Sequence, residues 1–381
     1  MASTLVRALR KARPLARSYG FLSTHPPTQC GLATFNSALA AHLTGSGGIV
    51  RVTADGDDER PQPGVVHTWS AGEADGWKAA AVALETFDVA IVQHEYGIYP
   101  GQDGEDVLPL LQNLAVPSVV VLHTVLARPT PRQKALLEEI VAAADAIVTM
   151  TGTARDRLLV GYRVDAAKVS LIPHGAADHM RVPARRGPRP HLLTWGLIGP
   201  GKGIEWALRA LAFLGDVSPT YTIAGKTHPK VLESQGETYR ESLYELADQL
   251  GVAGSVRHDP VYRDQESLSR LVRSADVVVL PYDSAEQVTS GVLIEAVAAG
   301  VPVVATSFPH AVELLTGGPG LLVPHGDPVA LAAAVRRVLT EPGLADTLAG
   351  RTRALVSDLL WPAVADRYAG LVGSLLVKQP A

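Results

Sequence analysis

The stretch PSVVVLHTVLARPTPRQKALLEEIVAAADAIVTMTGT, residues 117–153, decides the fold class. It opens with an apolar strand at Ser118–His123, continues with helical spacing over Arg132–Ala143, and closes with a second apolar strand at Ala146–Thr149. A strand, a helix of this length and another strand predict a crossover unit in a parallel sheet. The strands are apolar on both faces, which is typical of a sheet that helices cover on both sides.

The same alternation extends from this unit toward both ends of the chain. In the first half it predicts strands and helices at Tyr19–Ser23, Thr34–Leu43, Ile49–Thr53, Val65–Thr68, Val89–Gln93, Val107–Leu114 and Val169–Ile172. The stretch RVPARRGPR, residues 181–189, is basic and proline-rich, as expected of an interdomain linker. After it, strands are predicted at His191–Ile198, Tyr221–Ala224, Ser255–Arg257, Val277–Pro281, Val303–Ala305 and Gly320–Val323, and helices at Ile204–Leu214, Tyr239–Leu250, Glu266–Ser274, Gly291–Ala299 and Val329–Leu339.

The chain is therefore expected to form two doubly wound α/β domains, residues 18–180 and 191–361, joined by a linker at 181–190. Pro362 suits the first turn of a closing helix whose apolar positions recur at helical spacing. Parallel-sheet domains bind ligands at the carboxyl ends of their strands. If those ends face each other, the functional site lies in the cleft between the domains.

Composition narrows the classes of function. The 381 residues carry a net charge of −4, which argues against a dedicated nucleic-acid binder. The lone Cys30 excludes an internal disulfide and a cysteine-based zinc site. No uncharged apolar run reaches the roughly 18 residues of a membrane span. We expect a cytoplasmic enzyme, and residues 1–17, with five basic side chains and no acid, are either a solvated leader or a weak membrane-surface contact.

The segment QVTSGVLIEAVAAGVP, Gln287–Pro302, carries the strongest chemical signal. Thr289 and Ser290 can cap a helix that begins at Gly291, and the free amides of such a terminus suit a diphosphate. Glu295 lies one turn further along the same face, where its carboxylate can accept hydrogen bonds from ribose hydroxyls. The alternative is an ordinary capped core helix with Glu295 solvated or paired.

The segment WGLIGPGKGIEWALRAL, Trp195–Leu211, is a strand followed by a glycine-rich turn and a helix. Gly201 and its neighbours expose backbone amides, and Lys202 can place a point charge against a diphosphate. The pattern is neither a Walker loop nor a dinucleotide fingerprint. A plain turn with a surface lysine is the competing interpretation.

Together these segments resemble the second half of glycosyltransferase family 4, the retaining nucleotide-sugar transferases of the two-Rossmann GT-B fold. There a glycine-lysine-glycine turn and a pair of glutamates eight residues apart hold the donor. The likeness continues in five further segments: QCGLATFNSALAAHL, VVVLHT, ADAIVTMTGTARDRL, VSLIPHGAAD and WPAVADRYAGL, the last resembling the helix that crosses back to the first domain. It spans about residues 18–375.

Two positions depart from the family pattern. Gln287 stands where the first glutamate is expected, although Glu286 is adjacent, and Leu197 stands where an arginine is common. Gln287 still accepts a hydroxyl hydrogen bond but brings no charge to the donor sugar. Since one positive charge on the diphosphate is missing, we expect another cation to replace it. Lys226, which follows another strand end, is the candidate, with a solvated lysine as the alternative.

The first domain offers the remaining candidates. The resemblance implies that His123, at the end of its strand, acts beside the donor sugar; a structural histidine is the alternative. His94, Glu95 and Tyr96 in the loop HEYGIYPGQDG are expected to bind the acceptor. Gly31, in the loop before a helix, is a candidate for close approach to the phosphate. We expect no metal, because no third ligand with recognisable spacing joins the two histidines.

The sequence thus predicts transfer of a hexose from a nucleoside diphosphate sugar to an acceptor hydroxyl. The resemblance implies retention, with Lys202 and the amides near Gly291 stabilising the leaving group. GDP-mannose and UDP-hexoses are both compatible donors, and no separate cofactor is expected. Two rivals stay open: a nucleotide-sugar 2-epimerase of the same architecture, and a homologue that binds nucleotide sugars without catalysis.

Overall fold

The computed structural model describes residues 18–54, 60–73 and 75–378, and its strands follow the predicted apolar runs. In the first half they are β1 (Ser18–Ser23), β2 (Ser46–Thr53), β3 (Val65–Ser70), β4 (Val89–His94), β5 (Ser118–Leu122), β6 (Ala146–Thr149) and β7 (Val169–Leu171). In the second half they are β8 (His191–Trp195), β9 (Thr220–Ala224), β10 (Val256–Asp259), β11 (Val277–Leu280), β12 (Val303–Thr306) and β13 (Gly320–Val323).

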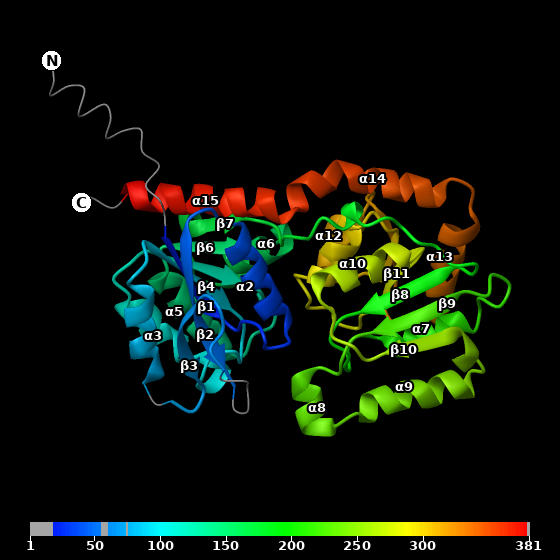
Figure 1. Ribbon diagram of the computed structural model, residues 1–381, viewed down its shortest axis with the longest axis horizontal. Coiled ribbons are helices and arrows are strands. Elements are labelled where there is room, and N and C mark those ends of the chain that lie inside the picture. The colour runs from blue at the N-terminus through cyan, green and yellow to red at the C-terminus, as the bar shows by residue number, and fades with distance from the viewer. Residues whose placement is uncertain (1–17, 55–59, 74, 379–381) are drawn as a thin grey trace, which may run out of the picture.

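Within these ranges the strands form two sheets, one in each half of the molecule (Figure 1). The first has seven strands in the described residues, in the order β3-β2-β1-β4-β5-β6-β7, and the second has six, in the order β10-β9-β8-β11-β12-β13. The strand pairs are parallel in both sheets. The predicted pair of doubly wound Rossmann-like domains is confirmed. In each sheet the order reverses beside the first strand, where such folds bind their ligands.

Helices connect the strands. Those of the first half are α2 (Gly31–His42), α3 (Gly76–Leu84), α4 (Val107–Asn113), α5 (Pro131–Ala143) and α6 (Gly152–Gly161). Those of the second half are α7 (Ile204–Leu211), α8 (Pro229–Gln235), α9 (Thr238–Gln249), α10 (Gln265–Ser274), α11 (Gly291–Ala298), α12 (Pro309–Leu315), α13 (Pro328–Thr340), α14 (Leu344–Leu359) and α15 (Trp361–Lys378). The predicted helices are present, whereas α3, α8, α12 and α14 were not anticipated.

Both faces of the first sheet are buried, as its uniformly apolar strands predict. Side chains alternate along each strand, so Leu22 and Leu122 pack against α3, α4, α5 and α6. Phe21 and Val121, one position earlier, pack against α2 and α15 on the other face. The second sheet follows the same rule, with α10, α11 and α12 on one face and α7, α9 and α13 on the other.

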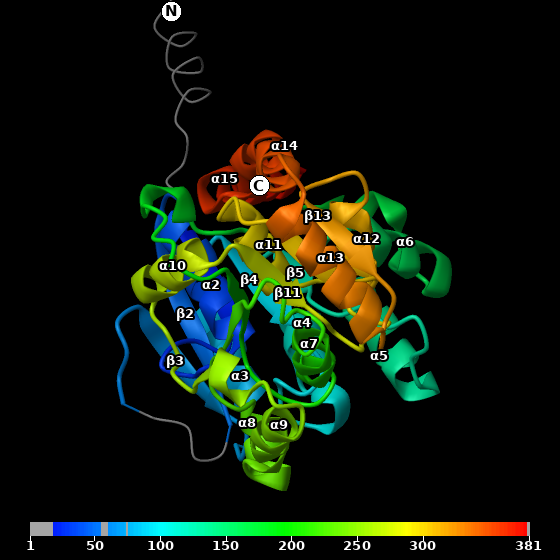
Figure 2. The same cartoon turned by 90° about the vertical axis from the view of Figure 1, so that its right-hand side faces the viewer.

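The chain passes twice between the domains, and the two crossings are bonded to each other. The amide of Ala176 donates to the carbonyl of Leu359 at 2.8 Å, and the amide of Trp361 donates to the carbonyl of Ala176 at 3.0 Å. Before the second crossing α14 lies over the second domain, and after it α15 returns to the first; both helices are on the side of the molecule opposite α8 and α9 (Figure 1 and Figure 2).

The apolar face of α15 completes the first domain. Trp361, Val364, Tyr368 and Val372 are buried against the strands of the first sheet and against α2. No helix in the described part of the chain has both the length and the apolarity to cross a membrane. The basic stretch 1–17, for which a membrane-surface contact was considered, lies outside the described residues.

Candidate functional site

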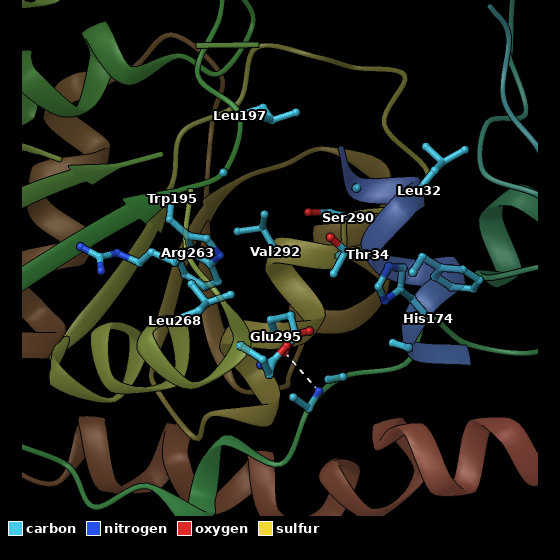
Figure 3. Close-up of a pocket in the computed structure, with 18 of the residues that line it drawn as sticks. Leu32, Thr34, His174, Trp195, Leu197, Arg263, Leu268, Ser290, Val292 and Glu295 are labelled. Carbon is cyan, nitrogen blue, oxygen red and sulfur yellow. Dashed lines mark hydrogen bonds between the residues drawn. The ribbon is translucent and has the colours of Figure 1, made fainter. Parts of the chain in front are cut away.

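A cleft of about 1530 Å³ lies between the domains. The second domain contributes the loops after β8, β10 and β11 and the start of α11, and the first domain contributes α2 and the loops after β4 and β5. Figure 3 shows side chains from both domains and from the crossing segment converging on this space. The carboxyl ends of both sheets therefore supply the walls, as parallel-sheet folds require.

The glycine-rich turn after β8 brings Lys202 into the cleft wall. Gly203 has a φ of +60°, and a Cβ there would come within 1.9 Å of the carbonyl oxygen of Pro281, so only glycine fits. The Lys202 ammonium nitrogen lies 4.4 Å from the ring centroid of Tyr282, a cation–π contact that holds the charge at the turn. Gly201 shapes this turn with a φ of +85°.

Lys226, the second cation expected near the diphosphate, lies outside the cleft, where it is exposed. Arg263, in the loop after β10, does line it and is paired with Asp259. Sequence reasoning missed this arginine, although it follows a strand end by the same rule that selected Lys226.

The start of α11 is built as expected for an anion site, with one qualification. The Ser290 hydroxyl accepts from the Leu293 amide at 3.3 Å, which caps the helix. The amide of Ser290 itself donates to Nδ1 of His310 at 2.8 Å. Burial lowers the pKa of His310 to about 4, so this nitrogen keeps its lone pair. The amides that remain for a ligand are therefore those of Gly291 and Val292.

The imidazole ring of His174 lies directly beside Gly291, in space that a side chain at this position would occupy. A Cβ at this position would come within 2.9 Å of Nε2 of His174. His174 lies on the first crossing between the domains, just before Ala176, and its Nδ1–H donates to the carbonyl of Gly175 at 2.6 Å. His174 thus packs against the start of α11.

Glu295 lines the cleft one turn further along α11. Its Oε2 atom accepts from the amide of Ala177 at 3.3 Å and makes a short contact with Nε2 of the buried His179. The carboxylate is paired, as the competing interpretation held, and it also faces the cleft (Figure 3).

The loop that carries Gln287 and Thr289 is tied to the first domain. The Gln287 amide nitrogen donates to the carbonyl of Thr289 at 3.2 Å, and both residues line the cleft. Glu286 lies 3.1 Å from Arg157 and 3.6 Å from Arg128. The acid beside Gln287 therefore forms an interdomain ion pair, and it also lines the cleft.

His123 follows β5 and lines the cleft from the first domain. Its Nε2 lies 2.8 Å from Oε1 of Gln93, and its ring packs edge-on against Phe35 at 4.8 Å. Burial, with smaller effects from His174 and His94, lowers the pKa of His123 to about 3. The ring is therefore neutral near pH 7, and its Nε2 is within hydrogen-bonding distance of the Gln93 side chain.

Of His94, Glu95 and Tyr96, the three residues expected to bind the acceptor, only Glu95 lines the cleft. There Glu95 accepts from the Thr124 hydroxyl and from the Tyr96 amide. Burial raises the pKa of Glu95. His94 is buried in β4 and Tyr96 packs edge-on against its ring at 5.3 Å, so neither lines the cleft. Gly31, at the first position of α2, does line it.

Several contacts hold the domains together around the cleft. The Glu313 carboxylate on α12 accepts from the amides of Gly152 and Thr153, at 2.7 and 2.8 Å, and so caps α6 of the other domain. The Thr34 hydroxyl lies 3.0 Å from that of Tyr262.

Among the described residues, no group of three or more His, Cys, Asp or Glu side chains is arranged to hold a metal ion.

The fold and the site define the class of protein. Two Rossmann-like domains whose strand ends meet at one cleft, closed by a helix that returns to the first domain, form the GT-B architecture of glycosyltransferases. Residues 30–178 match the model of Glycosyltransferase Family 4, and residues 189–341 match that of Glycosyl transferases group 1. The first match covers most of the first domain and the second covers most of the second domain. The chain therefore belongs to the family 4, group 1 glycosyltransferases.

Relatives with an assigned activity are moderately similar. A D-inositol 3-phosphate glycosyltransferase from Streptomyces avermitilis is 34% identical over 231 residues, 57% of this chain and 49% of the relative. The chain thus spans about half the length of that relative. A second protein of the same name, from Actinosynnema mirum, is 29% identical over 340 residues, which cover 82% of this chain and 72% of the relative.

Solved structures share the fold at low sequence identity. The Anabaena protein HepE, crystallised with UDP and glucose, has a TM-score of 0.73 at 16% identity and covers 94% of this chain and 100% of its own. Sucrose-phosphate synthase from Thermosynechococcus elongatus has a TM-score of 0.73 at 21% identity, covering 95% and 100%. These likenesses establish the GT-B fold.

Proposed function

We propose that this protein is a retaining hexosyltransferase that takes its sugar from a nucleoside diphosphate donor, a GDP- or UDP-hexose, and passes it to an acceptor hydroxyl. One observation carries the proposal. A single cleft brings Lys202, the start of α11 and Glu295 from the second domain opposite His123 and Glu95 from the first. The HepE structure, which holds UDP and glucose on the same fold, supports a nucleotide-sugar donor.

The leaving diphosphate would lie against the second domain. The Lys202 ammonium and the amides of Gly291 and Val292 supply positive charge and hydrogen-bond donors at the point where negative charge develops. Glu295, one turn further along α11, would accept hydrogen bonds from the ribose. In the proposed reaction these groups supply the charge, and no metal ion takes part.

The donor sugar would lie between Gln287 and His123. Both are neutral hydrogen-bonding groups, because Gln287 is an amide and His123 has a pKa of about 3. Neither is a carboxylate that could form a glycosyl ester with the donor sugar, and the nearby Glu286 is held by two arginines of the first domain. This arrangement supports attack on the face from which the diphosphate departs. The bond from the anomeric carbon to the diphosphate breaks, the bond to the acceptor oxygen forms, and the diphosphate takes the acceptor's proton.

The acceptor would bind against the first domain, where Glu95 lines the cleft. Its carboxylate, oriented by Thr124 and the Tyr96 amide, can accept a hydrogen bond from a hydroxyl of the acceptor. The relatives named for D-inositol 3-phosphate support an acceptor rich in hydroxyl groups. The interdomain contacts around the cleft would keep water from hydrolysing the donor.

A nucleotide panel followed by a transfer assay tests the proposal. A thermal shift with UDP, GDP, ADP and dTDP identifies the base, because a ligand that binds the folded state raises its melting temperature. The matching sugar nucleotide is then incubated with sugars and polyols, and products are identified by mass spectrometry and by the anomeric coupling in NMR. We expect an α-linked product from an α-linked donor.

The outcomes separate the proposal from its rivals. Epimerised sugar from the donor alone would support the 2-epimerase, and tight nucleotide binding without turnover on any acceptor would support a non-catalytic homologue. An inverted product would overturn the retaining mechanism. A failure of all four nucleotides to bind would contradict the donor site itself.

A further inference from the structure

His179 is a buried imidazole in a 3₁₀ turn, His179–Arg181, just beyond the first interdomain crossing. Its side chain is fully shielded from solvent. Nδ1 lies 2.8 Å from the hydroxyl of Ser269 on α10, and Nε2 makes a short contact with Oε2 of Glu295 on α11. The reaction described above gives this residue no role, since its ring does not line the cleft.

The hydrogen atoms around this ring can be assigned. The Ser269 hydroxyl has one hydrogen and donates it to the carbonyl of Gln265 at 2.7 Å. Its oxygen therefore accepts from His179, so Nδ1 carries a hydrogen. At the other end of the ring, two lone pairs would face each other unless a proton lies between Nε2 and Oε2. The His179–Glu295 pair therefore shares a proton, which makes the contact a charge-assisted hydrogen bond.

This bond fixes one side of the Glu295 carboxylate. The amide of Ala177 donates to the same Oε2 atom at 3.3 Å, the bond drawn as a dashed line in Figure 3. Two donors from the segment 177–179 thus converge on Oε2. The carboxylate is held with its other oxygen, Oε1, available to the cleft, which Glu295 lines.

We propose that His179 is a positioning residue for nucleoside recognition: it anchors Oε2 of Glu295 so that Oε1 is presented to the ribose hydroxyls of the donor. The inference rests on the proposed function, because it takes Glu295 to be the ribose ligand. The inference adds His179 to the residues that shape the donor site, although His179 itself does not contact the donor.

The test measures ribose discrimination, which a purely structural histidine would not control. Calorimetry gives the Kd of UDP and GDP and of their 2′-deoxy and 3′-deoxy analogues for the full chain. The wild type should bind the ribonucleotide about ten- to a hundredfold more tightly than at least one analogue, the range for a hydrogen bond to a charged group. In His179→Leu this ratio should fall toward one, because ribonucleotide affinity drops while the affinity of that analogue stays the same. His179→Gln, which keeps a donor, should restore part of the ratio.

His191→Leu is the matched control. His191 is a partly buried histidine at the start of the second domain, and like His179 it is hydrogen-bonded through both ring nitrogens: Nε2 lies 2.8 Å from the Thr222 hydroxyl and Nδ1 lies 3.2 Å from the carbonyl of Ser274. It does not line the cleft. Its loss should lower the melting temperature and leave the ratio of ribonucleotide to deoxynucleotide affinity unchanged.

The outcomes distinguish this inference from the proposed function. A wild type that binds both kinds of nucleotide equally would remove Glu295 from ribose binding and overturn this inference, whereas the transfer assay described above decides the proposed function separately. Two further results would overturn the role of His179 alone, provided that the wild type prefers the ribonucleotide. In the first, the His179→Leu variant keeps the same preference; in the second, it loses affinity for the ribonucleotide and for the deoxy analogue equally. If His179→Leu does not fold, His179→Gln and Ser269→Ala decide the question by the same ratio.

Discussion

Lys202 is the residue on which the leaving-group chemistry depends. Lys202→Ala should lower kcat by about a hundred- to a thousandfold, the usual loss when one group that stabilises developing charge is removed. The affinity for the bare nucleoside should change little, because the nucleoside has no diphosphate. Steady-state kinetics and calorimetry with uridine and guanosine measure the two effects separately.

Lys226→Ala is the matched control for that substitution. Lys226 has the same charge, belongs to the same domain and is exposed outside the cleft. Its replacement should leave kcat and nucleotide affinity unchanged. Equal activity in the Lys202 variant, or equal losses in both variants, would take Lys202 out of the mechanism.

At the residue scale, the sequence predicts which loops meet but not which way each side chain points. Lys202, Ser290 and Glu295 line the cleft because they follow strand ends in the expected order. Lys226 obeys the same rule, yet it is exposed. The pairing of Glu295 with His179 joins positions 116 residues apart, and no local sequence pattern indicates it.

At the scale of the element, the start of α11 depends on the absence of a side chain at its first position. A Cβ at Gly291 would come within 2.9 Å of the His174 ring, which is held in place by a hydrogen bond. Gly291→Ala should therefore lower stability by about 1–3 kcal/mol, the usual cost of overpacking, and should weaken diphosphate binding. Urea unfolding and calorimetry with UDP and GDP measure these effects.

Gly370→Ala provides the comparison for Gly291→Ala. Gly370 is within α15, and nothing lies within 4 Å of a Cβ built there. Alanine is favoured over glycine in a helix by roughly 1 kcal/mol, so this variant should be as stable as the wild type or more stable. A Gly291→Ala variant that matched it in both stability and binding would contradict the packing argument.

The cap that Glu313 provides for α6 links two elements of different domains. Burial alone would raise the pKa of Glu313, but the amides of Thr153 and Gly152 outweigh it, and the net shift is downward. Glu313→Gln replaces one acceptor oxygen by a donor and should weaken domain docking by about 1–3 kcal/mol. Small-angle scattering of the unliganded protein should show a larger radius of gyration.

Glu341→Gln tests whether that effect is specific to the domain interface. Glu341 pairs with Arg337 of α13 at 3.0 Å on an exposed surface. Exposed pairs of this kind contribute roughly 0–1 kcal/mol, and both partners of this pair belong to the second domain. The radius of gyration of this variant should equal that of the wild type, and an equal increase in both variants would argue against the cap.

Among the elements, strands were easier to predict than short helices. The strands are short apolar runs, many of them rich in valine and isoleucine, and most of them are buried on both faces. By contrast, α8 and α12 are seven residues long and each begins with a proline, so neither offers enough turns to show a helical period. In α14 a glycine at 350 and scattered polar residues blur the apolar stripe.

At the scale of the whole molecule, buried histidines should make folding sensitive to acid. Burial lowers the pKa of His94 and His310 to about 4 and that of His123 to about 3. The unfolded chain takes up these protons near pH 6.5 and the folded chain does not. Stability is therefore complete above pH 6.5 and falls as the pH drops toward 4, by about 1.4 kcal/mol per pH unit for each histidine.

Urea midpoints at pH 7.5 and pH 5 measure this loss. His94→Gln removes one of these histidines and should make the loss smaller. His42→Gln, which changes an exposed histidine of α2, should leave the loss as it is in the wild type. Equal midpoints of the wild type at both pH values would show that the buried rings are not responsible.

The return of α15 has a consequence for how the protein is made. The face of the first sheet that Trp361, Val364 and Tyr368 cover is complete only when the last part of the chain has been synthesised. On the ribosome, the first domain therefore exposes this apolar face of its sheet until the second domain and α15 have emerged. Nascent chains halted before residue 361 should therefore be held by chaperones, and release should follow once α15 clears the exit tunnel.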